Sequence, residues 1–382
     1  MNTLQLTSKF PNQSSIFAEM SRLAAECEAI NLSQGFPNFE VAPELIDAVT
    51  KYMKAGYNQY ALYYGMPQLR EQIAHKCERM IGYKPDSESN ITVTTGATEA
   101  LFCAITAVVH TGDEVIVFEP AYDSYSPVIR LSGGNPIPIA LKFPNYHIDW
   151  DEVKKKVTQR TKLIIINTPH NPTGSKLKPE DFEALSRIVT GRDILVLSDE
   201  VYEHMVFDDQ EHESVLHYPE LREQSFAVFS FGKTFHATGW KTGYCIAPAY
   251  LTKELRKVHQ HTVFSTSTPM QLAIAEYMSN PENYLNLYTY YQNKRDLFLD
   301  LMKDTKFKPL ACQGTYFQLM SYADISDEPD TEFAKWLTQE HGVATIPISV
   351  FYGSKEDNKV VRFCFAKTDH TLQAAAERLN AI

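Results

Sequence analysis

Residues 91–109 have the sequence ITVTTGATEALFCAITAVV, which combines a short apolar run, a turn and an apolar helical segment. The run at 91–95 has the length and composition of a buried strand. The string TGATE supplies the turn, and residues 101–109 have the pattern of a helix that packs behind the strand. This stretch therefore predicts one strand–turn–helix unit of an α/β sheet.

The same alternation of short apolar runs and helical segments continues to about residue 250. The runs show little internal alternation and usually end at polar or turn residues, which is typical of strands covered on both faces of a mostly parallel sheet. We therefore predict an α/β fold with strands at residues 91–95, 114–118, 163–167, 194–199, 226–231 and 242–247.

The last third of the chain has a different pattern, a mixture of helices and strands that predicts a second, smaller α/β domain. Its expected elements are one long helix at 280–304, strands near 314–320 and 360–366, and helices around 331–341 and 370–380. Part of the N-terminus is expected to join this domain. We place the large domain at residues 45–285 and the small domain at residues 1–44 and 286–382.

The overall composition excludes several classes of protein. The chain has 382 residues, of which 44% are hydrophobic and 22% charged, so it is neither disordered nor fibrous. A net charge of −11 argues against nucleic acid as the main partner. No apolar run approaches the length that a membrane span requires, and we expect no membrane association.

The cysteines and the N-terminal segment indicate the compartment. Six cysteines lie far apart without a C-x-x-C pair, which is typical of reduced thiols and not of a disulfide framework or a zinc site. The first fifteen residues, MNTLQLTSKFPNQSS, lack the pattern of a signal peptide. We therefore expect a cytoplasmic enzyme or binding protein without a bound metal.

Several familiar sequence motifs are absent or only partly matched in this sequence. No two glycines stand two positions apart, so the G-x-G-x-x-G motif of nicotinamide-binding enzymes is absent. The segment 232–234, GKT, matches the end of a P-loop, but Ala227 occupies the position of the first glycine. Ser230 and Lys233, followed by KTG at 241–243, match serine β-lactamase elements that are much farther apart in those enzymes.

Five short strings form a more specific pattern, and three of them begin at the carboxyl end of an expected strand, where open α/β sheets bind ligands. They are TGATEAL at 95–101, NPTG at 171–174, SDEVY at 198–202, SFGKT at 230–234 and GWKTG at 239–243. In this order and at these separations they resemble the class I and II aminotransferases of fold type I, which use pyridoxal 5′-phosphate (PLP). The resemblance covers essentially the whole chain and implies a seven-stranded sheet in the large domain.

The resemblance assigns catalytic roles to three residues. Lys233 matches the lysine whose amine attaches PLP covalently, and partial desolvation near other cations would free that amine. Asp199 matches the residue that pairs with the pyridine nitrogen. Tyr202, together with Asn171, would hydrogen-bond the hydroxyl oxygen of the cofactor ring.

The resemblance also implies a site for the cofactor phosphate. Gly96, Ala97 and Thr98 open an expected helix, whose N-terminus offers unpaired N–H groups to an anion. Ser230 and Lys241 would add a hydroxyl and a positive charge. The family usually carries arginine at the latter position, and lysine supplies the charge without the planar fork.

Two tyrosines have implied contacts with the cofactor. Tyr122 resembles the aromatic residue that stacks on the pyridine ring. Tyr60, in the string NQY at 58–60, matches a tyrosine that reaches the phosphate from the neighbouring subunit. The resemblance therefore implies a homodimer with shared active sites.

The amino-acid substrate would be held by its carboxylate and by its side chain. Arg362 matches the family arginine that binds the carboxylate in a bidentate pair. Gly35 would donate its backbone N–H to the same group, and Asn171 would also contact the substrate. The proposed walls of an apolar side-chain pocket are Phe17, Tyr63 and Phe264.

Further strings resemble the methionine and kynurenine aminotransferase subgroup, namely LSQGFP at 32–37 and NQY at 58–60. The stretches 199–204 and 364–367 are most similar to its bacterial members that act on methionine. Ser265 stands where the kynurenine branch has histidine. The implied reaction transfers the amino group of methionine or an aromatic amino acid to a 2-oxo acid. A kynurenine aminotransferase, a cysteine-conjugate β-lyase and a serine acyl hydrolase using Ser230 remain alternatives.

Overall fold

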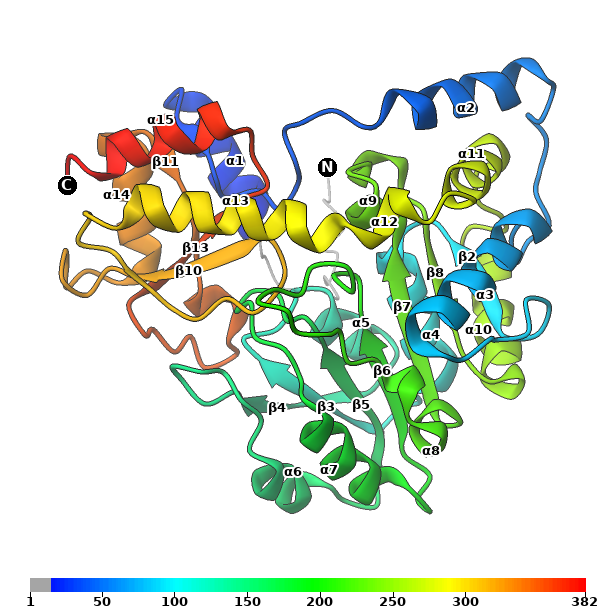
Figure 1. Cartoon of the computed structure of the whole chain (residues 1–382). Helices are drawn as coiled ribbons and strands as arrows, with labels where there is room; N and C mark the ends of the chain where they lie inside the picture. The colour runs from blue at the N-terminus through cyan, green and yellow to red at the C-terminus, as the bar shows by residue number, and fades with distance from the viewer. Residues whose placement is uncertain (1–14) are drawn as a thin grey trace, which may run out of the picture.

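The computed structural model describes residues 15–382 and contains three sheets. A seven-stranded sheet with helices around it forms the larger part, and a four-stranded and a two-stranded sheet lie with the C-terminal helices beside it (Figure 1). Within residues 15–382, no helix has both the length and the apolar character needed to cross a membrane.

The large sheet has the strand order β2-β8-β7-β6-β5-β3-β4. Strand β8 is antiparallel to both of its neighbours, and all other pairs are parallel. The mostly parallel seven-stranded sheet is thereby confirmed. Its strands are β2 Ile91–Thr94, β3 Glu114–Glu119, β4 Asn135–Ala140, β5 Thr161–Asn167, β6 Leu195–Asp199, β7 Ser225–Ser230 and β8 Gly243–Ile246.

Two apolar cores cover the two faces of this sheet, which explains why its strands are continuous apolar runs. Alternate residues of one strand enter different cores: Ile164 packs on one face, and Leu163 and Ile165 on the other. The helices that contribute to the first core include α2 Pro43–Lys54, α3 Pro67–Ile81, α6 Trp150–Lys156, α7 Pro179–Val189, α8 Pro219–Arg222 and α11 Thr268–Met278. Those of the second are α4 Ala97–Val108, α5 Tyr125–Leu131 and α10 Ala249–Thr262.

Strand β4 was not expected from its sequence, NPIPIA. It lies at the edge of the sheet and pairs only with β3. Pro136 and Pro138 lack an N–H group, which an edge strand tolerates because one side of it needs no partner. The two prolines argue against a strand in the sequence, and the strand forms because it lies at the edge of the sheet.

The C-terminal part has its own core beneath an antiparallel sheet of order β12-β13-β10-β9. Its strands are β9 Lys308–Pro309, β10 Phe317–Ser321, β12 Ile346–Pro347 and β13 Val360–Cys364. Helices α14 Asp330–His341 and α15 Asp369–Leu379 agree closely with the expected ones. The remaining short elements are α9 Phe231–Thr234 and the 3₁₀ turns Val215–His217, Thr238–Trp240 and Ser349–Phe351.

An N-terminal segment packs with the C-terminal third. Strand β1 Ile30–Asn31 pairs in parallel with β11 Val343–Ala344, and helix α1 Ile16–Glu26 packs against α14. The division at residues 45 and 285 remains a prediction, and residues 1–14 of the expected small domain lie outside the described residues.

The expected single helix at 280–304 is wrong at one position. The chain forms α12 Glu282–Leu285 and α13 Leu287–Met302, separated at Asn286. The Asn286 side chain donates a hydrogen bond to the carboxylate of Glu282 at 2.7 Å. Asparagine is a weak helix former, and the backbone of Asn286, with φ −94° and ψ 9°, departs from helical geometry at this point.

Candidate active site

A cavity of about 260 Å³ lies where several strands of the large sheet end. Asn167, Asp199 and Ser230, the last residues of β5, β6 and β7, line it, as expected for the ligand site of an open α/β sheet. The structure brings thirteen expected site residues to this cavity: Phe17, Gly35, Gly96, Ala97, Thr98, Tyr122, Asn171, Asp199, Tyr202, Ser230, Lys233, Lys241 and Arg362.

Lys233 lies in the short helix α9, directly after strand β7. Its amine donates hydrogen bonds to the carbonyl oxygen of Gly35 at 3.0 Å and to the hydroxyl of Tyr316 at 2.6 Å. Burial lowers the pKa of Lys233 to about 8, and the nearby positive charge of Arg362 contributes. The amine is therefore held in a fixed place and loses its proton more readily than an exposed lysine.

Asp199 is buried at the end of β6. The hydroxyl of Tyr125 donates to its carboxylate at 2.6 Å, and the Val201 N–H makes a weaker contact at 3.4 Å. Burial raises the pKa of Asp199 to about 6, although both donors act in the opposite direction. The carboxylate is thus placed to receive a positive partner inside the cavity.

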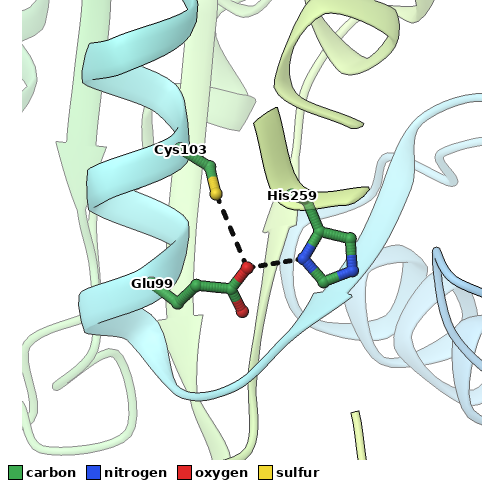
Figure 2. A group of neighbouring side chains, drawn as sticks. All are labelled: Glu99, Cys103 and His259. Atoms are coloured by element: carbon green, nitrogen blue, oxygen red, sulfur yellow. Dashed lines mark hydrogen bonds and ion pairs between the residues drawn. The ribbon is translucent and has the colours of Figure 1, made fainter. Parts of the chain in front are cut away.

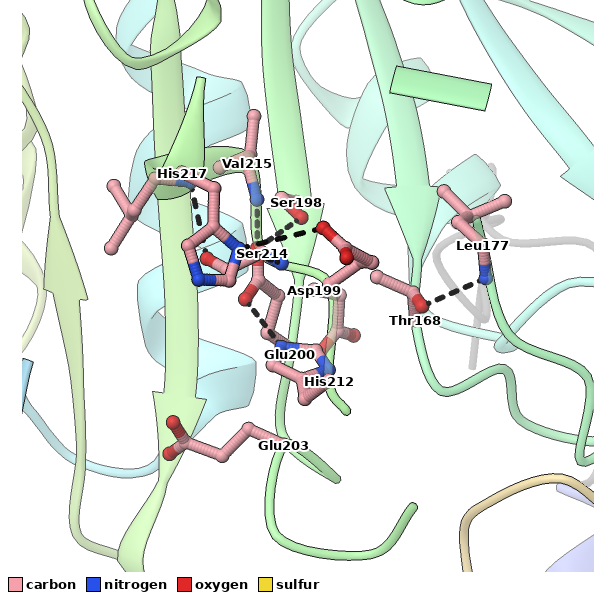
Figure 3. A network of polar contacts seen from close by, with 12 residues as sticks. Thr168, Leu177, Ser198, Asp199, Glu200, Glu203, His212, Ser214, Val215 and His217 are labelled. Atoms are coloured by element: carbon pink, nitrogen blue, oxygen red, sulfur yellow. Dashed lines mark hydrogen bonds and ion pairs between the residues drawn. The ribbon is translucent and has the colours of Figure 1, made fainter. Parts of the chain in front are cut away.

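A buried polar network fixes the turn that follows Asp199 (Figure 3). The Glu200 carboxylate accepts hydrogen bonds from Ser198 at 2.7 Å and from the Val215 N–H at 3.0 Å, and it lies 2.8 Å from Nε2 of His212. Burial opposes ionisation of Glu200, but His212 together with the hydroxyls of Ser198 and Ser214 outweighs this effect and lowers the pKa. These contacts restrain the backbone of the turn directly after Asp199.

Arg362 extends from strand β13 into the cavity and is almost completely buried. One terminal nitrogen donates to the side-chain oxygen of Asn171 at 2.8 Å, and the other donates to the Ser33 carbonyl at 3.1 Å. The guanidinium carbon lies 3.9 Å from the centre of the Phe317 ring. Its Nε has no hydrogen-bond partner within residues 15–382, so a donor remains for a carboxylate.

The N-terminus of helix α4 forms another wall of the cavity. Gly96 precedes the helix with a positive φ of 76°, a conformation that glycine adopts without strain. A Cβ at that position would lie 3.1 Å from the amine of Lys241, so glycine also permits the lysine to approach. A helix N-terminus beside a cation suits an anion such as a phosphate.

Three expected residues lie away from the cavity in the single chain. Tyr60 is 84% exposed, and its ring centre lies 5.3 Å from that of Phe264, which is 45% exposed. Tyr63 is absent from the lining, and its carbonyl oxygen faces His259. A single chain therefore does not bring these three residues to the cavity.

Sequence reasoning missed several residues of the site. Tyr125 stands three positions after Tyr122, and this spacing was the available indication that both enter the same site. Tyr316 meets Lys233 only through the three-dimensional fold, because the two are 83 positions apart. These two tyrosines contact Asp199 and Lys233 without lining the cavity, and the missed residues that do line it include Gln34, Asn167, Val201, Thr238 and Phe317.

Comparisons with known proteins agree with this geometry. A family model described as aminotransferase class I and II matches residues 28–379. Methionine aminotransferase of Escherichia coli K12 is 51% identical over 100% of this chain and 99% of its own length. Human kynurenine–oxoglutarate transaminase 1 is 34% identical over 95% of this chain and 94% of its own.

Solved structures extend the agreement to the whole fold. The crystal structure of YbdL from E. coli, reported with a methionine aminotransferase function, has a TM-score of 0.97 at 50% identity and covers both chains completely. N-succinyldiaminopimelate aminotransferase from Mycobacterium tuberculosis has a TM-score of 0.95 at 35% identity and covers 99% of this chain and 100% of its own. The chain therefore belongs to the class I and II aminotransferases, enzymes that exchange an amino group between amino acids and 2-oxo acids.

Proposed function

We propose that this chain is a PLP-dependent aminotransferase that takes the amino group of methionine, and of aromatic amino acids, and transfers it to a 2-oxo acid. The observation that carries the proposal is that Lys233, Asp199 and Arg362 line one cavity. The 51% identity to methionine aminotransferase of E. coli K12 supports the choice of donor.

The residues of the cavity fit PLP. Lys233 offers an amine with a pKa of about 8, Asp199 offers a buried carboxylate, and the N-terminus of α4 with Lys241 offers an anion site. We assign Lys233 to covalent attachment, Asp199 to the ring nitrogen, and Asn171 with Tyr202 to the ring hydroxyl. The phosphate would bind at Gly96, Ala97, Thr98, Ser230 and Lys241, and Tyr122 would stack on the ring.

The chain's own groups would then bind the donor and move its proton. When bound, PLP supplies an electron-withdrawing ring that makes the α-hydrogen of the amino acid acidic. Arg362 and Asn171 orient the α-carboxylate, and Gly35 adds a backbone N–H. The freed Nζ of Lys233 takes the α-proton and later returns one, and the contacts to Gly35 and Tyr316 limit how far this amine can move.

The charges around the cavity support an uncharged donor side chain. The cations that line it within residues 15–382 are Lys233, Lys241 and Arg362, and all three have assigned partners. A second carboxylate on the donor would therefore be buried without a counter-charge. Phe17 and Phe317 supply apolar surface. We assign Phe17 to the side-chain pocket of its own chain, and Phe264, which pairs with Tyr60 at the surface, to the pocket of the partner subunit.

A kynurenine aminotransferase or a cysteine-conjugate β-lyase activity is the second candidate. The 34% identity to human kynurenine–oxoglutarate transaminase 1 supports it over most of the chain. Ser265, in place of the histidine of that branch, favours methionine. All of these activities use the same cavity and cofactor; a kynurenine aminotransferase differs in the side chain of the donor, and a β-lyase differs in the reaction, because it eliminates the group on the β-carbon.

We further propose a homodimer in which Tyr60 completes the phosphate site of the partner subunit. The exposure of the Tyr60–Phe264 pair supports this arrangement, since two large aromatic rings at the surface are suited to burial in an interface. A cytoplasmic location is supported by the six cysteines, all of which are free. Analytical ultracentrifugation would test the dimer.

Incubation with PLP, methionine and a 2-oxo acid tests the proposed function. We expect formation of the 2-oxo acid of methionine together with the amino acid of the acceptor. Lys233→Ala should abolish turnover, and borohydride reduction of the wild-type protein should leave the cofactor on Lys233. Absence of amino transfer from methionine, or attachment elsewhere, would contradict the proposal.

A further inference from the structure

A buried carboxylate and a buried imidazole meet behind the proposed phosphate site (Figure 2). Glu99 lies in the first turn of α4, three residues after Gly96, and His259 comes from α10. Nδ1 of His259 is 2.5 Å from Oε1 of Glu99. Both side chains are at least nine-tenths buried, with 0% exposure for His259 and 8% for Glu99.

The hydrogen bonds around this pair determine its total charge. Nε2 of His259 faces the carbonyl oxygen of Tyr63, which can only accept, and Nδ1 faces the carboxylate. Both contacts are satisfied only if the Glu99–His259 pair holds two protons, either as imidazolium with carboxylate or as imidazole with carboxylic acid. The pair is electrically neutral in both cases.

Glu99 itself is tied to the loop that enters α4. Its Oε2 accepts the backbone N–H of Thr95 at 2.5 Å, and its Oε1 lies 3.5 Å from the thiol of Cys103. Thr95 directly precedes Gly96, the first of the proposed phosphate ligands. The carboxylate therefore shapes the anion site but, if it were charged and unpaired, would repel an anion bound there.

We propose that His259 neutralises Glu99 and so keeps the N-terminus of α4 able to bind the phosphate of the cofactor. This inference rests on the proposed function. It makes His259 a positioning residue that acts through Glu99 and the loop at Thr95, without contact to the cofactor. The helix N-terminus keeps its favourable field because the Glu99–His259 pair beneath it carries no net charge.

The same histidine holds the segment that carries Tyr60. Besides the His259–Tyr63 contact, Thr268 donates to the Gln59 carbonyl at 2.5 Å. Gln271 accepts the N–H of Met66 at 2.7 Å. His259 therefore links the phosphate site to the surface segment proposed to enter the partner's site.

A metal ion is a weaker explanation of this cluster. Glu99, Cys103 and His259 offer three potential ligand atoms within 4.8 Å of one another. However, Nδ1 and Oε1 are already in direct contact, which leaves no room for an ion between them. Burial raises the pKa of Cys103, and a metal would need its thiolate.

The test compares His259→Gln, Glu99→Gln and the double variant. The readouts are the dissociation constant of PLP from the cofactor-free protein and the thermal stabilisation of that protein by inorganic phosphate. His259→Gln leaves Glu99 buried without its counter-charge, so we expect both affinities to fall on the order of tenfold or more. The double variant removes the charge as well and should recover most of that loss.

His212→Gln is the matched control, because it removes the histidine of the buried pair with Glu200, which has no hydrogen bond to α4. Its affinity for inorganic phosphate should stay within about twofold of wild type. Unchanged affinity in His259→Gln, or a double variant as weak as that single variant, would overturn the inference. Wild-type protein that binds inorganic phosphate but not PLP would contradict the proposed function. The phosphate affinities of the wild type and the His259 variants would still test the inference about His259.

Discussion

The amine of Lys233 lies 2.6 Å from the hydroxyl oxygen of Tyr316, and that hydroxyl also donates to the carbonyl of Gly35. The amine donates to the same carbonyl, so the three groups form a closed set of hydrogen bonds. Tyr316 therefore holds Lys233 from the side of the C-terminal sheet. This contact joins the proposed attachment residue to the residue directly before β10, which is remote in sequence.

Replacing Tyr316 with phenylalanine should alter the titration of Lys233. Burial lowers the pKa of Lys233 to about 8, so the cofactor-free protein should attach PLP faster as the pH rises toward and through that value. The Tyr316 oxygen accepts a hydrogen bond from the charged amine and thereby stabilises it. Tyr316→Phe should shift the midpoint of the attachment rate to lower pH, measured by stopped-flow absorbance.

Tyr291→Phe provides a control, since the Tyr291 hydroxyl bonds His236 at 2.9 Å and not the lysine. Its midpoint should match that of the wild type. An unchanged midpoint in Tyr316→Phe would show that the tyrosine does not influence the amine.

Arg362→Lys should weaken every amino donor to a similar extent. Lysine keeps the charge but loses the planar fork that contacts Asn171 and the donor carboxylate. We expect a loss of about 2 kcal/mol or more in kcat/KM, measured for several donors. A loss confined to one donor would instead place Arg362 at the side chain.

Tyr125→Phe should make cofactor binding more sensitive to acid. Asp199 has a pKa of about 6 because burial raises it, and the Tyr125 hydrogen bond restrains the rise. Affinity for PLP should therefore fall as the pH drops through about 6 and Asp199 takes up a proton. In Tyr125→Phe the pKa rises further, so the fall should begin at higher pH; a shift to lower pH would contradict this.

Hybrid dimers test whether Tyr60 acts across the interface. We expect Tyr60→Phe and Lys233→Ala each to be severely impaired. If Tyr60 serves the partner's site, a hybrid of the two has one site with both defects and one with neither, so mixing should restore part of the activity. No recovery, with subunit exchange verified by mass spectrometry, would place Tyr60 in its own subunit or outside the site.

Much of the large sheet could be predicted because its strands are buried on both faces. Six of its seven strands are apolar runs bounded by turn residues, and Asp199 and Ser230 follow from their places at strand ends. Strand β4 was missed because Pro136 and Pro138 argue against a strand anywhere except at an edge. The break at Asn286 was missed because one weak helix former does not normally end an otherwise continuous helical pattern.

The residues that line the cavity or support it from behind divide in the same way. Those in local strings, such as Lys233 and Asn171, were identified by their resemblance to a family. Tyr125, Tyr316 and His259 were missed because their importance arises from contacts between distant segments. A sequence pattern shows only the neighbours of a residue along the chain. The partners of these three residues come from segments that are distant in sequence and meet only in the folded structure.

The most direct test of the proposed activity is the ratio of kcat/KM for methionine to that for aspartate, with the same 2-oxo acid. Within residues 15–382 the cavity offers apolar surface and no unassigned cation, so methionine should be preferred by on the order of a hundredfold or more. A similar value for aspartate would contradict the account, because it would require a cation that the lining residues do not supply.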